Sequence, residues 1–280
     1  MSSNTLPTAE WVLITGGTHG IGLSLAFESL RQGLGVVAIG LPDEDFSPAT
    51  DRLRSRSPQN FHSIALDLTA NGAVDSVMDY LCQEGITVSY LINNAGFGRG
   101  GLFEHTNWAE YRTMMTLNNQ VMVELTYRLL PHLRKCGGGI LNLSSMEATL
   151  PLPYKTVYTG TKAFVYNFSL ALREEFRHHG VSVTVLCPGP VLTNADGLRR
   201  LEAQGYRAKL LVTTPDAIAP RAIKGMLDGK AVIVPGLLTR ILIMTSYLTP
   251  RALRMRILEK VFSRYREPAP SSLEPLEVPQ

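Results

Sequence analysis

The chain has 280 residues, of which 45% are apolar and 18% charged, and its formal net charge is only +3. These values are ordinary for a soluble globular protein, and the small charge argues against a nucleic-acid binder. No uninterrupted apolar run approaches the roughly 18 to 20 residues of a membrane-spanning helix, and the first ten residues do not resemble a secretory signal. The cysteines Cys82, Cys136 and Cys187 are far apart and odd in number, so we expect reduced thiols in a cytoplasmic protein and no metal site.

The first predicted elements are a strand, a glycine-rich turn and a helix. Residues 11–15 (WVLIT) form a short apolar run, and residues 21–30 carry apolar side chains at helical spacing. Between them lies GGTHGIG, in which Gly16, Gly20 and Gly22 follow the spacing G-x-x-x-G-x-G. Glycines there allow a sharp turn and leave room for a pyrophosphate against backbone N–H groups at the helix start. The alternative is a purely structural strand-to-helix turn.

Strands and helices alternate along the rest of the chain. We predict strands at 36–39, 61–66, 90–93, 140–143, 181–186 and 231–234, and helices at 73–84, 108–133, 158–178 and 215–228. Residues 42–60 are expected to form a loop that can hold a short helix, and residues 194–214 a mobile flap. This alternation predicts an α/β fold: a single Rossmann-like, doubly wound parallel sheet of about seven strands, with helices on both faces.

Tyr158 and Lys162 stand four residues apart at the start of a predicted helix, which places phenol and ammonium one turn apart on the same face. A nearby cation lowers the pKa of a phenol from about 10, so Tyr158 becomes a usable proton donor or acceptor near neutral pH. Ser145 closes the apolar run ILNLSS, at the kind of strand end where parallel sheets bind ligands. The alternative is a surface tyrosine beside a solvated lysine.

Five motifs stand in order: TGGTHGIG (15–22), NNAG (93–96), Ser145, YTGTK (158–162) and PGPVLT (188–193). Together they resemble the classical short-chain dehydrogenase/reductase family, over about residues 11–234. The resemblance implies an NAD(P)-dependent oxidoreductase that transfers a hydride between nicotinamide and a secondary alcohol or ketone. The alternative function is a non-catalytic dinucleotide-binding sensor or scaffold on the same fold.

The resemblance also implies catalytic roles. Tyr158 would be the general acid or base, and Lys162 would lower its pKa and hold the nicotinamide ribose. Ser145 would bind the substrate oxygen on which charge develops. Asn118 would position a proton-relay water, with its neighbour Asn119 as a competitor for that role.

Cofactor-binding residues follow from the same resemblance. They are Thr15, Gly16, Thr18, His19, Gly20, Ile21, Gly22, Gly40, Leu41, Asp67, Leu68, Asn94, Ala95, Gly96, Pro188, Gly189, Val191 and Thr193, together with Tyr158 and Lys162. Asp67 is expected either to meet the adenine amino group or to act as a helix N-cap. Asn94 is expected to tie neighbouring strands together, and Thr193 to meet the nicotinamide carboxamide.

The end of the second strand bears on cofactor preference. It carries Gly40 and Leu41, neither the acid that binds a ribose 2′-hydroxyl nor an arginine for a 2′-phosphate. The missing acid removes a repulsion against the 2′-phosphate and favours NADP. Asp43 and Glu44, if they turn back towards this point, would favour NAD.

Substrate, assembly and location are expected by resemblance alone. Met146, Glu147 and Tyr154 would line the substrate pocket, where Glu147 either recognises a polar group or faces solvent. The sequence LINNAGFG, the PGP loop and the C-terminal extension resemble a branch of the family that includes hydroxysteroid and long-chain ketoacyl reductases. This resemblance implies a lipophilic ketone or alcohol as substrate. The family implies a homodimer or homotetramer, with helices 108–133 and 158–178 pairing between subunits.

We divide the chain into a dinucleotide-binding and catalytic domain (1–236), an amphipathic helical extension (237–266) and a tail expected to be disordered (267–280). Residues 251–266 hold six basic residues and one acid, a net charge of +5. A predicted apolar helix face comprises Met255, Ile257, Leu258, Val261, Phe262 and Tyr265. Such a helix can lie on an anionic membrane surface as a peripheral contact. The alternative is that this face packs on its own sheet or on a partner subunit.

Overall fold

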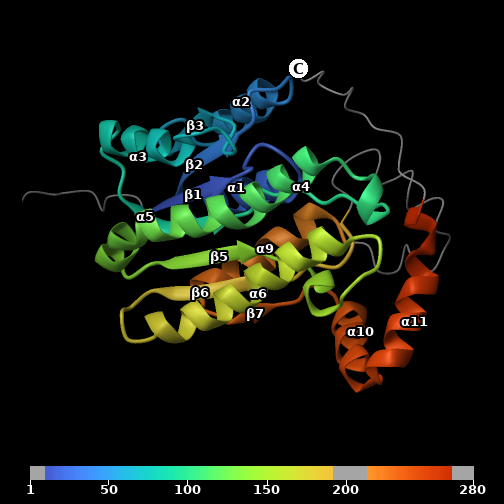
Figure 1. Cartoon of the computed structure of the whole chain (residues 1–280). Coiled ribbons are helices and arrows are strands. Elements are labelled where there is room, and N and C mark those ends of the chain that lie inside the picture. The colour runs from blue at the N-terminus through green and yellow to red at the C-terminus, as the bar shows by residue number, and fades with distance from the viewer. Residues whose placement is uncertain (1–9, 192–212, 267–280) are drawn as a thin grey trace, which may run out of the picture.

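One parallel β-sheet forms the centre of the computed structural model, which describes residues 10–191 and 213–266 (Figure 1). Its strands are β1 (Trp11–Thr15), β2 (Gly35–Gly40), β3 (Phe61–Ala65), β4 (Val88–Asn93), β5 (Gly139–Leu143), β6 (Ser182–Leu186) and β7 (Val232–Ile233). They lie in the order β3-β2-β1-β4-β5-β6-β7 and all pair in parallel. The strand order reverses between β1 and β4, the point at which open parallel sheets bind ligands. The predicted Rossmann-like fold is confirmed.

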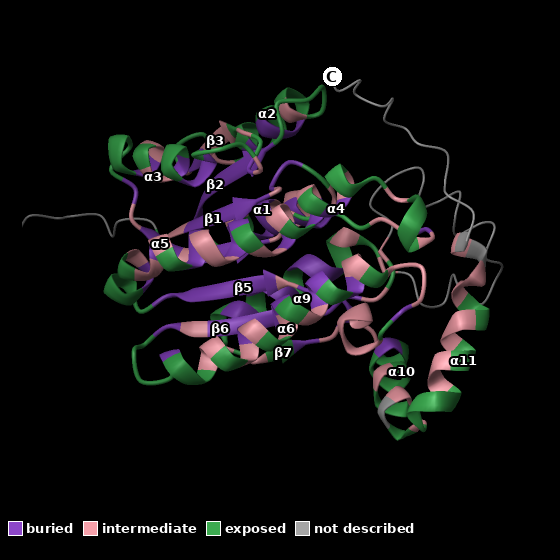
Figure 2. Ribbon diagram, in the orientation of Figure 1, coloured by how far each residue is buried: buried purple, intermediate pink, exposed green. Residues whose placement is uncertain are grey.

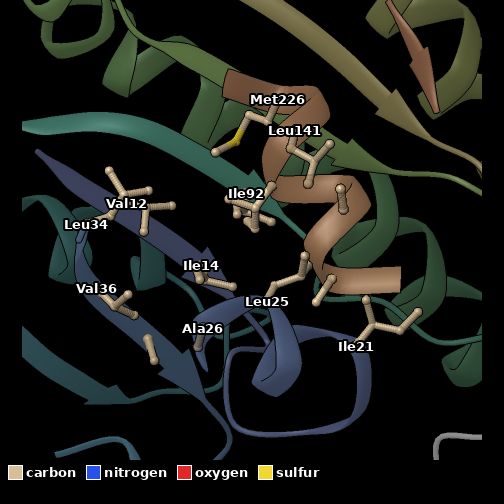
Figure 3. Close-up of a cluster of buried hydrophobic side chains, with 14 of the residues drawn as sticks. Val12, Ile14, Ile21, Leu25, Ala26, Leu34, Val36, Ile92, Leu141 and Met226 are labelled. Atoms are coloured by element: carbon tan, nitrogen blue, oxygen red, sulfur yellow. The ribbon is translucent and has the colours of Figure 1, made fainter. Parts of the chain in front are cut away.

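Helices cover both faces of this sheet, because successive residues of a strand point to opposite sides. Val12 and Ile14 contribute to a core with α1 (Gly20–Arg31), α2 (Phe46–Arg56) and α9 (Pro215–Leu227), shown in Figure 3. Leu13, between them, contributes to a second core with α3 (Ala73–Gln83), α5 (Val121–Cys136) and α6 (Thr156–Phe176). All three β1 side chains are fully buried, so the strand that leads to the glycine turn is held from both faces.

Two helical segments were predicted only in part. The loop expected at 42–60 contains α2, a helix of 11 residues whose short buried face is Ala49, Thr50 and Leu53. The helix expected at 108–133 is instead α4 (Trp108–Met115) and α5, joined by a π-helical turn at Thr116–Gln120. Gly137, with a φ of 63°, ends α5 in the left-handed conformation that favours glycine. Thr193, most of the predicted flap and the predicted tail lie outside the described residues.

The C-terminal extension forms two helices, α10 (Leu237–Leu248) and α11 (Arg251–Phe262), followed by a 3₁₀ turn at Ser263–Arg266. In Figure 1 this helix pair lies beyond the carboxyl ends of the strands. The predicted apolar face of α11 is only partly covered by protein, since Ile257 and Val261 are 49% and 51% exposed. No helix in residues 10–191 and 213–266 is both long enough and apolar enough to cross a bilayer.

Candidate active site

The glycine turn between β1 and α1 is shaped for close approach of a ligand to backbone. Gly16 and Gly20 have φ angles of 62° and 48°, in the left-handed region. A Cβ added to Gly22 would overlap the carbonyl oxygen of Gly16. The turn therefore needs glycine at these positions, and α1 begins at Gly20 with its first N–H groups directed outwards along the helix axis. This cradle fits the pyrophosphate of a dinucleotide.

Asn94 fixes the turn against β4. Its side-chain amide donates to the carbonyl oxygens of Thr15 and Gly16, at 2.9 and 3.1 Å. In return, the Thr15 hydroxyl oxygen accepts hydrogen bonds from the backbone N–H groups of Asn94 and Ala95, at 3.0 and 2.9 Å. The ends of β1 and β4 are thereby locked together, as the sequence led us to expect of Asn94.

The end of β2 has no space for an acidic side chain at position 40. A Cβ on Gly40 would overlap the side chain of Thr18, which explains the absence of an acid there. Leu41, the next residue, is 53% exposed. The imidazole Nε2 of His19 lies 3.7 Å from Asp43 Oδ1 and 3.3 Å from Asp45 Oδ2. Two carboxylates thus surround His19 at the rim of the glycine turn.

The remaining candidate cofactor residues lie on two other strand ends. Asp67 Oδ1 accepts hydrogen bonds from the backbone N–H and the hydroxyl of Thr69, both at 2.8 Å, in a local turn. Asp67 does not cap α3, whose N-cap residue is Gly72. Leu68 is buried. After β6, the Pro188 carbonyl accepts the Met146 N–H at 2.9 Å, which joins the loop of Pro188, Gly189 and Val191 to the turn after Ser145.

Ser145 and Tyr158 lie close together at the carboxyl end of β5, near enough for the Ser145 hydroxyl to act on the pKa of the phenol as a hydrogen-bond partner. Ser145 also caps the 3₁₀ turn Met146–Thr149, where its Oγ accepts the Glu147 N–H at 3.1 Å. The sequence predicted a lowered pKa for Tyr158, but in the structure burial and the Glu147 carboxylate raise its pKa above 10, and the Ser145 hydrogen bond offsets only part of this. The expectation was wrong because it counted the lysine and not the loss of solvent.

Lys162 lies one turn after Tyr158 on α6 and is only 4% exposed. Its Nζ donates to the Leu143 carbonyl at 2.8 Å. Burial lowers the pKa of this ammonium from 10.5 to about 8, while the neighbouring Cys187 thiol acts in the opposite direction. The Cys187 pKa is itself raised to about 12 by burial. The lysine is therefore held in place at a considerable desolvation cost.

Asn118 lies on the π-helical turn and is buried. Its amide nitrogen donates to the Phe97 carbonyl and to the Thr161 hydroxyl, both at 3.0 Å, and its amide oxygen accepts the Phe97 N–H at 3.1 Å. Asn119 donates to the Thr161 carbonyl instead. A π-turn, which is rare and concentrates at functional sites, thus directs Asn118 towards the loop after β4. A small cavity lies beside it, lined among others by Lys162 and Ala95.

Sequence reasoning missed Gly98, which follows the NNAG motif, and the contact of Gly96 with the candidate catalytic side chains. A Cβ on Gly98 would lie 2.6 Å from Cδ2 of Tyr158, and one on Gly96 would lie 2.7 Å from the Asn118 Oδ1 and 3.4 Å from the Lys162 Nζ. Glycine at both positions lets the loop after β4 lie directly against three of the candidate catalytic side chains. The repeated glycines of AGFGRG were the available signal.

Lys155 is the second residue that was missed. Its ammonium pairs with Glu147 Oε1 at 2.8 Å, and both side chains are mostly buried. The same ammonium lies 5.9 Å from the ring centre of Tyr158, and 5.8 and 5.1 Å from those of Phe262 and Tyr265. The other carboxylate oxygen of Glu147 is buried without a hydrogen-bond partner. The α11 end of the chain therefore contacts the candidate site through Lys155.

Tyr154 strengthens this contact. Its hydroxyl donates to Glu259 Oε1 of α11 at 2.9 Å, and its carbonyl accepts the Gly101 N–H at 2.8 Å. Its backbone has a φ of 65°, the only positive φ among the described residues other than glycine. The segment around Tyr154 thus contacts both α11 and the loop after β4, and a substrate-pocket role for Met146, Glu147 and Tyr154 stays a prediction.

Comparison with known proteins agrees with this geometry. The sequence matches the family model of short chain dehydrogenases over residues 10–203. It is 30% identical over 200 residues to the very-long-chain 3-oxoacyl-CoA reductase of Bos taurus, which covers 68% of this chain and 62% of that protein. It is 35% identical over 179 residues to the serine 3-dehydrogenase of Agrobacterium fabrum, which covers 64% and 70%. A solved 7β-hydroxysteroid dehydrogenase is similar with a TM-score of 0.80 at 22% identity, over 89% of this chain and 96% of that one.

The matched region carries strands β1 to β6, the glycine turn and the Ser145, Tyr158 and Lys162 side chains. The match to the bovine reductase spans 62% of that protein's length, and the structural likeness at 22% identity shows the fold alone. The family model covers well over half of the 280 residues. The chain therefore belongs to the short-chain dehydrogenase/reductase family.

Proposed function

We propose that this protein is an NAD(P)-dependent oxidoreductase that interconverts a ketone and a secondary alcohol. The observation that carries the proposal is the proximity of Ser145 and Tyr158, with buried Lys162 one helical turn away and Asn118 across the loop after β4. A non-catalytic dinucleotide sensor, the alternative, has no need of a serine–tyrosine pair or of a buried ammonium. When bound, the nicotinamide supplies or accepts the hydride.

Each of the four side chains has a chemical task in this proposal. Ser145 donates a hydrogen bond to the substrate oxygen, and Tyr158 transfers the proton to or from that oxygen. Lys162 holds the ribose hydroxyls, and Asn118 keeps the loop at Phe97 in place and orients a proton-relay water. Because burial and Glu147 raise the pKa of Tyr158, its phenol is protonated at neutral pH. That state supports proton donation, and thus carbonyl reduction.

For the cofactor we propose NADPH over NADH. The glycine turn would hold the pyrophosphate, and the ends of β2 and β3 would hold the adenosine half. Support comes from Gly40, where Thr18 leaves no room for a carboxylate, and from the exposed, uncharged Leu41. Asp43 and Asp45 act in the opposite direction, because they lie beside His19 at the rim of the glycine turn, where their carboxylates would repel a 2′-phosphate.

For the substrate we propose a lipophilic ketone, such as a steroid-like or long-chain ketoacyl compound. Support comes from the rings of Phe262 and Tyr265, which lie near Lys155. Tyr154 is bonded to α11 next to them, and Met146 directly follows Ser145. The bovine relative is named for a very-long-chain 3-oxoacyl-CoA. Glu147 is paired with Lys155, so it serves this pocket as half of an ion pair.

For assembly and location we propose a cytoplasmic homodimer or homotetramer in which α4–α5 and α6 pair between subunits. Residues 1–236 would be the catalytic unit. Residues 237–266 would be an extension that contacts both this unit and a membrane surface.

The test is turnover of a panel of ketones with NADPH and NADH in parallel, by the wild type and by Tyr158→Phe. This change removes the transferable proton, so we expect turnover to fall by about 10² to 10⁴-fold while dinucleotide affinity stays nearly unchanged. Tyr127→Phe, on the exposed face of α5, is the matched control and should behave as wild type. Near-normal turnover by Tyr158→Phe would refute the proton-donor role. A wild type that binds NADPH but turns over no ketone or alcohol would favour the sensor.

A further inference from the structure

Helix α10 turns its apolar side away from the protein. Leu237, Ile241, Met244 and Leu248 recur at the spacing of one helical face, and all four are exposed, Leu237 by 74% and Leu248 by 83%. The opposite face carries Thr239, Ile243 and Ser246, which are buried or half-buried. In an ordinary surface helix the two faces would be exchanged.

Helix α11 also turns some of its apolar side chains away from the protein. Leu253, Ile257 and Val261 follow one another at intervals of four residues, and each is about half exposed. Met255, Leu258 and Phe262, on the side towards the protein, are half-buried. We call Leu237, Ile241, Met244 and Leu248 of α10, together with Leu253, Ile257 and Val261 of α11, the outer stripe. Figure 2 shows how much of this helix pair is exposed. Large exposed apolar patches of this kind mark interaction sites.

Positive charge accompanies the outer stripe. Residues 237–266 contain seven lysines and arginines and one acid. Arg240, Arg251, Arg256 and Lys260 are exposed, whereas the one acid, Glu259, accepts a hydrogen bond from Tyr154 on the inner side. Arg254 holds the two helices together by donating to the Ser246 carbonyl at 3.0 Å. The surface offered to a partner is therefore apolar and cationic, with no exposed carboxylate of its own.

We propose that the outer stripe docks on the surface of an anionic lipid bilayer. Helices with an apolar face and a basic rim lie in the plane of the interface, with the apolar side chains among the acyl chains and the cations at the headgroups. Neither helix can cross a bilayer, since each has only 12 residues. A second copy of this chain is the poorer occupant, because pairing through the same surface would bring two positively charged rims together.

This docking places the bilayer beside the candidate active site. The inner side of α11 contacts the segment just before Tyr158, through Glu259 with Tyr154 and through Phe262 with Lys155. If the proposed function holds, a lipophilic ketone dissolved in the bilayer has only a short path to Ser145 and Tyr158. The docking itself depends on neither substrate nor cofactor.

The test is co-sedimentation of the full chain with vesicles of phosphatidylcholine, with or without phosphatidylserine, at low and high salt. We expect binding to the phosphatidylserine vesicles that weakens as salt rises. Arg256→Gln combined with Lys260→Gln should weaken it by about 25-fold, at about fivefold per charge. Leu248→Ser should weaken it by about tenfold or more. Leu227→Ser, at an exposed leucine of α9 outside the stripe, is the matched control and should bind as wild type. Circular dichroism and dinucleotide binding confirm that each variant is folded.

Three outcomes would overturn the proposal. The first is no vesicle binding at low salt by folded wild-type protein. The second is equal binding to both vesicle types, independent of salt. The third is a dimer in sedimentation that Leu248→Ser dissociates, without vesicle binding, which would assign the stripe to a second copy. The vesicle assay contains no substrate or cofactor, so a failure to bind vesicles does not bear on the proposed oxidoreductase activity. The result of the ketone panel, in turn, does not bear on the proposed docking.

Discussion

Replacing Lys162 by methionine should make the stability of this protein respond differently to pH. Burial lowers the pKa of the Lys162 ammonium from 10.5 to about 8. One pKa unit corresponds to about 1.4 kcal/mol, so the charged side chain costs the folded state about 3 kcal/mol at pH 7. Between the two pKa values the unfolded chain binds more protons than the folded one, so this contribution to wild-type stability rises as pH increases from 8 to 10.5. Methionine, which has a similar length, does not titrate and therefore makes no such contribution.

The difference in the free energy of unfolding between Lys162→Met and the wild type should therefore depend on pH. The free energy of unfolding of Lys162→Met minus that of the wild type should fall by about 3 kcal/mol between pH 7 and pH 10.5. The lost hydrogen bond to the Leu143 carbonyl costs the variant about 1 to 3 kcal/mol, but this cost is nearly the same at both pH values. At pH 7 the two effects oppose each other, so the variant should be about as stable as the wild type or slightly more so.

The assay is urea unfolding of nucleotide-free protein at both pH values, followed by circular dichroism. Free energies are compared only where the two proteins share the same m-value, because a chain of this size can unfold in more than one step. Lys135→Met, at an exposed lysine of α5, corrects for the loss of a lysine as such. A Lys162→Met difference that stays constant from pH 7 to pH 10.5 would show that the ammonium is solvated, and the account of the site's electrostatics would then be wrong.

Three further changes probe the site. Gly98→Ala places a Cβ 2.6 Å from the Tyr158 ring, so kcat should fall by about 10²-fold without loss of fold. Gly160→Ala, which has open space around it, is the control and should not affect kcat. Equal kcat values for the two variants would refute the contact of Gly98 with Tyr158. Glu147→Gln removes a charge that raises the pKa of Tyr158, so the alkaline limit of the pH–rate profile should move to lower pH, and an unchanged limit would contradict this. Leu41→Asp should weaken NADPH binding about tenfold more than NADH binding, as measured by fluorescence titration; a wild type that binds NADH at least about tenfold more tightly would end the proposed preference.

The sheet could be predicted from the sequence because its strands are continuous apolar runs that end at glycine or polar motifs. VLI in β1 and VVAI in β2 are fully buried, and such runs leave little choice of structure. The π-turn at Thr116–Gln120 could not be predicted, since its extra residue is stabilised by contacts of Asn118 and Asn119 with Thr161, 42 or more residues away. Helix α2 was underestimated because only one of its faces, centred on Leu53, is apolar.

The site was predictable as a set of positions and less so as chemistry. From the order of the motifs we predicted that Ser145, Tyr158, Lys162 and Asn118 lie at one end of the sheet. The direction of the Tyr158 pKa shift depends on burial and on Glu147, and neither is visible in a Tyr-x-x-x-Lys pattern. Helical periodicity likewise predicts which residues of α11 share an apolar face, but it does not predict whether that face is turned towards the protein or away from it. The orientation of α11 depends on its contacts with the segment before Tyr158.

Lys155 links the C-terminal extension to the candidate active site. Without its ammonium, the Glu147 carboxylate would stand uncompensated near Tyr158 and raise the pKa of the phenol further. The ammonium is kept in place partly by the rings of Phe262 and Tyr265. The extension therefore contributes to the electrostatics of the proposed proton donor, although it follows the last strand of the sheet. A movement of α11 would therefore reach the surroundings of Tyr158 through Lys155, and also through the hydrogen bond from Tyr154 to Glu259.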